Sequence, residues 1–504
     1  MFKCQAHNGL GEAWPRLLFG DRLKMKVVQK HEARSDNSLD RDPSDDEARL
    51  PAHDEDLDHM GIQEGHEPQD DLRASLKAIF SWENYRVYLA TAWVFNAFTY
   101  LTSFLNLYLW SIIPNLIFIG AIGTATSAIA ATARFFGGYV GDTVDRKTLS
   151  VVSFLLMAIY YLMIGIFIDP IFIFMALVVS SSMELTRSGS TAYIMDNMPQ
   201  EHSGLALSLF TAGRALSIIT LAVFAFLYPF IEFEAYRQLH LVGGVLLLIC
   251  TIARARYLKS SQLKQREAGT KLWRAFIGDN SRALRILLTI LPGMIVVCVL
   301  DAISDSFFRL GALIYMYDVL FIDIQSIAIM FIVTLGIEVP LLLRIGRLSD
   351  RKGVKSTALL IYAAMPISAA FLILASWFPD WAPSSFVDAA NLVIPGLGVV
   401  FKTSFLGVVL KYVNDTLWYT IMLVLIRKRM PGQDTSKILA MFWVVIYLAS
   451  SFGPLVGGLI SESTNILFLF VAVLVLNLLI LGAIARYDLT SRGQQVRENV
   501  TQKS

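Results

Sequence analysis

The sequence predicts an all-α integral membrane protein in which twelve transmembrane helices form two pseudo-repeats of six helices, preceded by a disordered N-terminal tail. Three observations carry this prediction. Of the 504 residues, 55% are hydrophobic and 17% are charged, with a mean hydropathy of +0.55, which is too apolar for a soluble protein. Apolar segments recur at bilayer-spanning length, and one short loop sequence occurs twice, 208 residues apart.

Residues 1–80 differ in composition from the rest of the chain. Between His31 and Ser75 there are 15 Asp or Glu residues against 4 Arg, and aromatic residues are few. Such a composition cannot bury enough apolar surface to offset the entropy lost when a chain becomes ordered. We therefore expect a disordered, acidic tail.

The apolar segments that follow are predicted to be helices. About 20 residues at a rise of 1.5 Å cover the ~30 Å hydrocarbon core of a bilayer. Backbone groups in lipid must be satisfied within the segment, which favours helices over strands. The predicted spans are 85–109, 112–136, 149–168, 171–194, 204–230, 238–257, 286–317, 322–345, 356–378, 403–426, 437–460 and 464–485.

The connections carry their positive charge on one side of the membrane. The loops after even-numbered spans hold about 20 Lys and Arg, counted with the flanking helix ends and including Arg254, whereas the opposite loops hold two, Arg237 and Lys402. This asymmetry predicts a multi-pass protein of the cell (plasma) membrane with both termini in the cytoplasm. The predicted parts are the tail 1–80, a six-helix half 81–257, a basic cytoplasmic linker 258–285, a second half 286–485 and a C-terminal tail 486–504.

Two copies of one loop sequence join apolar spans. The first copy reads Gly138-Tyr-Val-Gly-Asp142-Thr-Val-Asp145-Arg146-Lys147, and the second reads Gly346-Arg-Leu-Ser-Asp350-Arg351-Lys-Gly353-Val-Lys355. The pattern resembles the loop motif of the major facilitator superfamily, which reads roughly Gly-x-x-x-Asp-(Arg/Lys)-x-Gly-(Arg/Lys)-(Arg/Lys) and follows the second and eighth helices. Departures from the motif are Thr143, Asp145 and Val354. The gating residues that the resemblance implies are Gly138, Asp142, Arg146, Lys147, Gly346, Asp350, Arg351 and Gly353.

The resemblance implies a secondary transporter built from two parallel halves of six helices, with a central cavity lined by the first, fourth, seventh and tenth helices. A further stretch, Gly453-Pro-Leu-Val-Gly457-Gly458 in the eleventh span, looks like a Gly-Pro-x-x-Gly-Gly motif that some members, chiefly antiporters, carry in the fifth helix. Its displaced position leaves antiport undecided. Close packing of helices is the alternative role for these small residues.

Ionisable side chains inside the spans are the candidates for a functional site. A charged group at bilayer depth costs several kcal/mol unless it faces the protein interior or a cavity. Glu184, Asp301 and Asp415 each fall near the middle of a span. The candidate residues for binding a substrate or a proton are Asn96, Glu184, Arg187, Asp301, Asp305, Arg309, Lys411 and Asp415.

The seventh span carries the strongest pattern. Asp301, Asp305 and Arg309 are spaced four residues apart and therefore line one face of a helix. Repulsion and desolvation would favour one proton held between the two carboxylates. Arg134 and Glu338 fall closer to the ends of their spans, and we expect them to pair or snorkel at the cytoplasmic edge, outside the site.

The remaining charges allow two interpretations. Glu184 and Arg187 are three residues apart, and Lys411 and Asp415 are four apart, so each pair could neutralise itself and hold helices together. Alternatively, the charges bind a solute or carry a proton. Charges of both signs favour a polar or zwitterionic solute over a lipophilic one.

These observations predict transport of a small solute by alternating access, coupled to protons. The alternatives are a member of the same family that has lost transport and acts as a membrane sensor or scaffold, and a channel. The sequence holds no nucleotide-binding glycine loop, zinc spacing or Ser/His/Asp arrangement, so we expect no enzymatic activity, cofactor or metal. A net charge of +2 indicates no nucleic-acid partner. We expect a monomer whose partners are a small-molecule substrate, protons and the lipid bilayer.

Overall fold

The computed structural model describes residues 72–187, 193, 209–210, 212–260, 272–290, 292–352, 354–429 and 435–487. Most of the predicted N-terminal tail and nearly all of the C-terminal tail lie outside these residues. Within them the chain is helical, and the β-type pairing is limited to an isolated bridge between Asp380 and Lys402.

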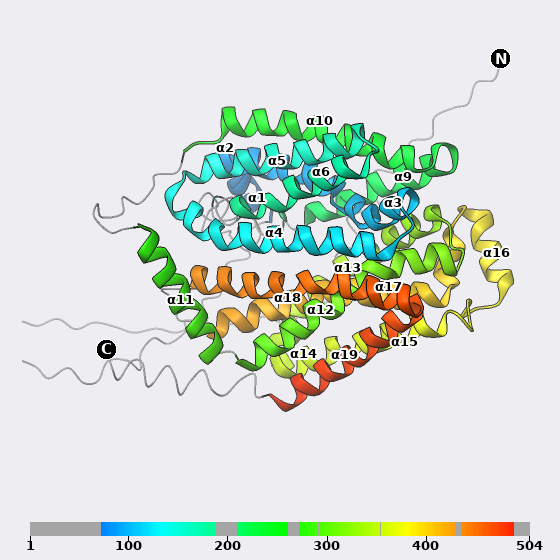
Figure 1. Cartoon of the computed structure of the whole chain (residues 1–504). Helices are drawn as coiled ribbons and strands as arrows, with labels where there is room; N and C mark the ends of the chain where they lie inside the picture. The colour runs from blue at the N-terminus through cyan, green and yellow to red at the C-terminus, as the bar shows by residue number, and fades with distance from the viewer. Residues whose placement is uncertain are drawn as a thin grey trace, which may run out of the picture. The chain divides into compact units, whose positions relative to one another are not determined.

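The helices of the first half are drawn from blue to green in Figure 1. The first predicted span is divided by a 3₁₀ turn, η1, between two α-helices. The elements are α1 (Leu72–Ser81), α2 (Glu83–Thr99), η1 (Tyr100–Phe104), α3 (Leu105–Ile112), α4 (Leu116–Thr143), α5 (Arg146–Ile166), α6 (Pro170–Ser182), η2 (Gly213–Leu216), α9 (Ser217–Ile231) and α10 (Phe233–Tyr257).

The second half begins after α11, a helix that covers much of the predicted linker. The seventh predicted span, the first of this half, ends in a π-helical turn, η3. A short helix, α16, lies in the connection after α15. The elements are α11 (Leu272–Ile290), α12 (Pro292–Ile314), η3 (Tyr315–Val319), α13 (Ile324–Lys352), α14 (Val354–Tyr362), α15 (Ala364–Leu374), α16 (Ser384–Val393), η4 (Leu397–Phe401), α17 (Thr403–Arg429), α18 (Thr435–Ser463) and α19 (Ile466–Arg486).

Each of the twelve predicted spans overlaps helical structure, and the all-helical membrane fold is confirmed. Within the described residues, eight helices are long and apolar enough to cross a bilayer, and a ninth results if the bent pair α11 and α12 counts as one span. The other spans are interrupted or polar: η1 divides the first, and α12, α13 and α17 carry charged residues in their interiors. The least apolar spans are thus the ones that supply much of the candidate site.

Side chains at the helix starts explain where several spans begin. Asp169 accepts a hydrogen bond from the backbone N–H of Ile171 (2.8 Å), and Pro170 occupies the first helical position of α6. Asn115 caps α4 in the same way, accepting from Phe118 N–H at 2.8 Å. These caps satisfy amide groups that a helix start leaves without intrahelical partners.

Packing of the helices repeats between the halves. The third and sixth helices of the first half, α5 and α10, pack against each other, as do their counterparts α15 and α19 in the second half. The halves meet where α4 packs against α18 and where α9 packs against α13. Each contact joins the second helix of one half to the fifth helix of the other, as two related halves require.

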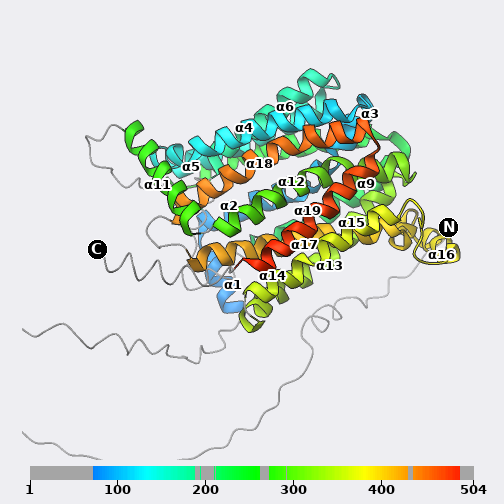
Figure 2. The same cartoon turned by 60° about the horizontal axis from the view of Figure 1, so that its bottom comes forward.

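The contact between α4 and α18 brings backbones together at one end of the bundle; Figures 1 and 2 both show these helices side by side. A Cβ added at Gly458 would lie 2.4 Å from the carbonyl oxygen of Leu116, and one added at Gly120 would lie 2.3 Å from that of Pro454. The Glu462 carboxylate accepts a hydrogen bond from Leu116 N–H (2.9 Å). The glycines of the eleventh span thus allow the halves to approach closely.

One arginine that the charge pattern assigns to the cytoplasmic edge is buried. Arg254 of α10 is 0% exposed, and its guanidinium donates to Thr91 Oγ1 (2.8 Å) and Ser150 Oγ (2.7 Å). The guanidinium also lies over the rings of Tyr88 (4.2 Å) and Phe154 (3.4 Å). Hydroxyl acceptors and aromatic faces can hold a guanidinium that is withdrawn from water. Arg254 therefore fixes α10 against α2 and α5.

The repeated loops lie at the ends of α4 and α13. In the first copy, α4 continues through Gly138 to Thr143, and α5 begins at Arg146. In the second copy, α13 continues through Gly346 to Lys352. The side chains of Asp142, Asp350 and Arg351, together with residue 353, lie outside the described part of the structure, and the gating assignment stays a prediction.

Candidate functional site

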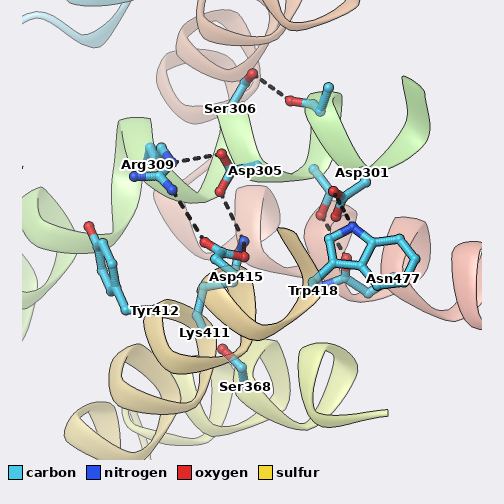
Figure 3. Close-up of polar contacts among 12 residues, drawn as sticks. Asp301, Asp305, Ser306, Arg309, Ser368, Lys411, Tyr412, Asp415, Trp418 and Asn477 are labelled. Carbon is cyan, nitrogen blue, oxygen red and sulfur yellow. Dashed lines mark hydrogen bonds and ion pairs between the residues drawn. The ribbon is translucent and has the colours of Figure 1, made fainter. Parts of the chain in front are cut away.

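Four charged side chains from α12 and α17 form a closed ring of ion pairs, shown in Figure 3. Arg309 Nε donates to Asp305 Oδ2 (2.6 Å), and Arg309 Nη2 donates to Asp415 Oδ2 (3.3 Å). Lys411 Nζ donates to Asp305 Oδ1 (2.9 Å) and to Asp415 Oδ1. Each cation therefore contacts both carboxylates, and each carboxylate contacts both cations.

Helix periodicity explains the ring. Asp305 and Arg309 are one helical turn apart on α12, and Lys411 and Asp415 are one turn apart on α17, so each helix presents a cation and a carboxylate on one face. Where the two faces meet, the intrahelical pairs also pair across the interface. The ring has no net charge, which lowers the cost of holding the ionised groups between the helices.

Asp301 lies one turn before Asp305 but has different partners. Its carboxylate accepts hydrogen bonds from the Tyr362 hydroxyl (2.8 Å) and from Trp418 Nε1 (3.0 Å). Among the described residues, no Lys or Arg lies within 4.0 Å of Asp301. Two neutral donors thus hold a carboxylate beside a ring that is already neutral.

Asn477 of α19 connects Asp301 to a third helix. Its Oδ1 accepts from Ser304 Oγ (2.8 Å) and lies 3.2 Å from the Tyr362 hydroxyl. Tyr362 has a single hydroxyl hydrogen, so it can donate either to Asp301 or to Asn477, but not fully to both. The hydrogen bonding of Tyr362 therefore depends on whether Asp301 carries a proton.

A second charged group lies in the first half. Glu184, which is 6% exposed, accepts from Arg134 Nη1 of α4 (3.3 Å) and from Arg187 Nη1. Arg134 thus joins this group, although its position in the sequence suggested the edge of the span.

Glu338 and Asn96 lie elsewhere between the helices. Glu338 of α13 is 2% exposed and accepts from the Tyr100 hydroxyl (3.2 Å), so it is buried between the halves and does not snorkel. The backbone oxygen of Asn96 accepts a hydrogen bond from Ser217 Oγ. The Asn96 side chain packs against Gly213, where an added Cβ would lie 2.9 Å from Asn96 Nδ2. Asn96 thus belongs to the contact between α2 and η2.

The structure therefore divides the sequence candidates among three places. Asp305, Arg309, Lys411 and Asp415 form the ring with Asp301 beside it, Glu184 and Arg187 form the second group, and Asn96 stands apart. The sequence interpretation missed Tyr362, Trp418 and Asn477. The feature of the sequence that could have identified them as site residues is a polar group inside an apolar span. Within the described residues, no cluster of three or more His, Cys, Asp or Glu has a geometry suited to a metal ion.

Comparisons with known proteins agree with this architecture. The nucleoside transporter NupG is 14% identical in sequence, with a TM-score of 0.56 over 81% of this chain and 99% of NupG. The inward-open xylose transporter XylE from E. coli is 16% identical, with a TM-score of 0.58 over 81% of this chain and 96% of XylE. The human organic anion transporter MFSD10 is 15% identical, with a TM-score of 0.52 over 81% and 99% of the two chains. The chain shares its fold with these proteins.

Sequence comparison gives the family. No curated protein sequence matches the chain. The family model for the Major Facilitator Superfamily matches residues 87–417, from the first span into the tenth. The paired halves described above and the repeated loop sequence agree with that match. The chain belongs to the major facilitator superfamily.

Proposed function

We propose that this protein is a secondary active transporter that moves a small polar solute by alternating access and couples this movement to protons. Family membership and fold support transport across a membrane. The observation that carries the proposal is the charged ring between α12 and α17 with Asp301 beside it. Ionisable groups inside membrane helices are costly and typically mark the path of a solute or ion.

The ring would be the solute site. A polar solute that enters it replaces ion pairs within the protein by ion pairs or hydrogen bonds to the solute, so the ring can open without leaving a buried charge unpaired. The contacts between α4 and α18 and between α9 and α13 are the surfaces at which the two halves would rock.

Asp301 would carry the proton. When it is ionised, it accepts from Tyr362 and Trp418. When it is protonated, it can donate to the Tyr362 oxygen, and Tyr362 can then donate to Asn477 Oδ1, 3.2 Å away. Protonation would thus change a hydrogen bond that links α12, α14 and α19, which supports coupling between the proton and the movement of helices.

Proteoliposomes test this function directly. We expect purified protein, supplied with a panel of polar metabolites and an imposed pH gradient, to accumulate at least one solute and to move protons only when that solute is present. The companion measurement is circular dichroism, which shows that the reconstituted protein is helical. If folded protein moves neither solute nor protons, the result would favour the alternative function, a membrane sensor or scaffold. We propose no enzymatic activity for the protein.

We also propose that the protein is a monomer of the plasma membrane. Both of its termini would lie in the cytoplasm, because Lys and Arg concentrate in the loops after even-numbered spans. A reporter fused after Ser504 should be protected from external protease in intact cells and become accessible on permeabilisation. The matched control is the same epitope inserted between α15 and α17, which should be accessible in intact cells. Labelling of the C-terminus at the surface of intact cells would show that the orientation is opposite to the proposed one.

A further inference from the structure

The balance of charge in the ring restricts the solutes that it can bind. Asp305 and Asp415 supply two negative charges, and Arg309 and Lys411 supply two positive ones. Binding must separate some of these pairs, and each separated charge needs a new partner, since a buried and unpaired ion is strongly destabilising. The solute must therefore offer charges that match those it displaces.

Solute classes differ in how well they meet this requirement. An uncharged solute offers only hydrogen bonds to the ions it separates. Counted over the four ring groups, an anion can pair with Arg309 but adds one negative charge, and a cation adds one positive charge. A solute with one charge of each sign can pair its positive group with a carboxylate of the ring and its negative group with a cation of the ring. The total charge of the ring and solute then stays zero.

Exposure of the ring shows which edge a solute meets first. The Arg309 side chain is 49% exposed, Asp305 is 30% and Asp415 is 19%, whereas Lys411 is 3% exposed. The accessible edge is therefore a guanidinium between two carboxylates, and the buried edge is Lys411. A guanidinium binds a carboxylate through two parallel hydrogen bonds, and a carboxylate on either side accepts from an ammonium group.

Aromatic rings border the charged edge. The Arg309 guanidinium lies 5.6 Å from the centre of the Tyr412 ring, and Lys411 Nζ lies 5.5 Å from the centre of the Phe308 ring. These ring faces favour a cation. Because Arg309 contacts both carboxylates directly, a bound solute needs its two charges only a few bonds apart.

From this geometry we infer that the transported solute is a small zwitterion with adjacent ammonium and carboxylate groups, of the α-amino acid type. This inference rests on the transport function proposed above. It specifies the ring as the site of recognition, with Arg309 holding the carboxylate and Asp305 or Asp415 holding the ammonium group.

Matched derivatives test the inference in proteoliposomes. The panel contains α-amino acids with apolar, polar and charged side chains, together with sugars and nucleosides. For the amino acids with uncharged side chains it also contains the cationic methyl esters, the anionic N-acetyl forms and the uncharged N-acetyl methyl esters. We expect uptake of a free amino acid, with at least tenfold weaker competition by each of its derivatives. Preferred uptake of an uncharged or singly charged solute would overturn the inference and leave the transport function standing. Failure of every compound would instead remove the transport function, and the inference with it.

Variants of the ring provide a second test. Arg309→Gln leaves one excess negative charge, so the preference should move at least tenfold toward the methyl ester. Asp415→Asn leaves one excess positive charge, so the preference should move toward the N-acetyl form. The control is Asp388→Asn on α16, an exposed position outside the ring, which should retain the original order. Parallel losses for the free amino acid and its three derivatives in both ring variants would show that the ring is structural and overturn the inference.

Discussion

Asp301→Asn is expected to abolish proton-coupled uptake while leaving the protein folded and inserted. The asparagine side chain has nearly the same shape, and its one oxygen can accept from Tyr362 or from Trp418, which donate to different oxygens of the native carboxylate at 2.8 Å and 3.0 Å. An amide cannot bind and release a proton near neutral pH, so the coupling step is lost. The measurement is uptake driven by a pH gradient, compared with exchange of labelled solute at equal pH.

A selective loss would identify the role of Asp301. We expect exchange at equal pH to persist, because the ring of Asp305, Arg309, Lys411 and Asp415 is intact in this variant. Asp388→Asn on α16 makes the same chemical change at an exposed position and should leave both activities unchanged. Tyr362→Phe removes the hydrogen that is shared between Asp301 and Asn477, so it should slow coupled uptake without abolishing it. Undiminished coupled uptake in Asp301→Asn would exclude this carboxylate from the mechanism.

Lys411→Met should have the largest effect on stability. Lys411 is 3% exposed and contacts both Asp305 and Asp415, so its loss leaves two carboxylates with Arg309 as the remaining cation of the ring. Breaking a buried ion pair from one side typically costs about 3–5 kcal/mol, and here two carboxylates would share one cation. We expect a clear fall in the melting temperature of the purified protein and loss of uptake.

The double variant Lys411→Met with Asp415→Leu separates stability from function. It leaves Arg309 paired with Asp305 and restores a neutral site, so most of the stability should return. Solute affinity should remain reduced, because half of the ring is gone. The matched control is Lys402→Met with Asp380→Leu, which removes an ion pair of the same residue types (2.9 Å) outside the ring. Unchanged apparent affinity in a folded Lys411 and Asp415 double variant would assign α17 a structural role.

Much of the fold follows from the sequence because lipid imposes simple rules. Spans of about 20 apolar residues must be helices, and the loop sequence repeated 208 residues apart indicated two related halves. The rules do not show how a side chain near a helix end is packed. Arg254 was counted with the cytoplasmic loop, but its long side chain reaches back between α2 and α5, where hydroxyl groups and aromatic rings surround it.

The site was predictable only within single helices. The spacing of Asp305 and Arg309, and of Lys411 and Asp415, follows from the helical repeat, so each pair was found. Their union into a ring depends on how α12 faces α17, which a sequence without its packing does not reveal. Asn477 was missed for a related reason: it is a single polar residue in an apolar span, and its partners lie on other helices.

The backbone contact between α4 and α18 bears on which step limits the rate of turnover. At Gly458 and Gly120 the backbones of these helices meet directly, and the side chains of Glu462 and Thr124 accept hydrogen bonds from backbone N–H groups across the contact, so this end of the bundle can separate and close with few rotamers to release or reorder. The ring is different, because its charges must exchange partners and meet water during each cycle. The largest energy barrier to transport is therefore expected at the charged ring. The contact between α4 and α18 is expected to open and close with a smaller barrier.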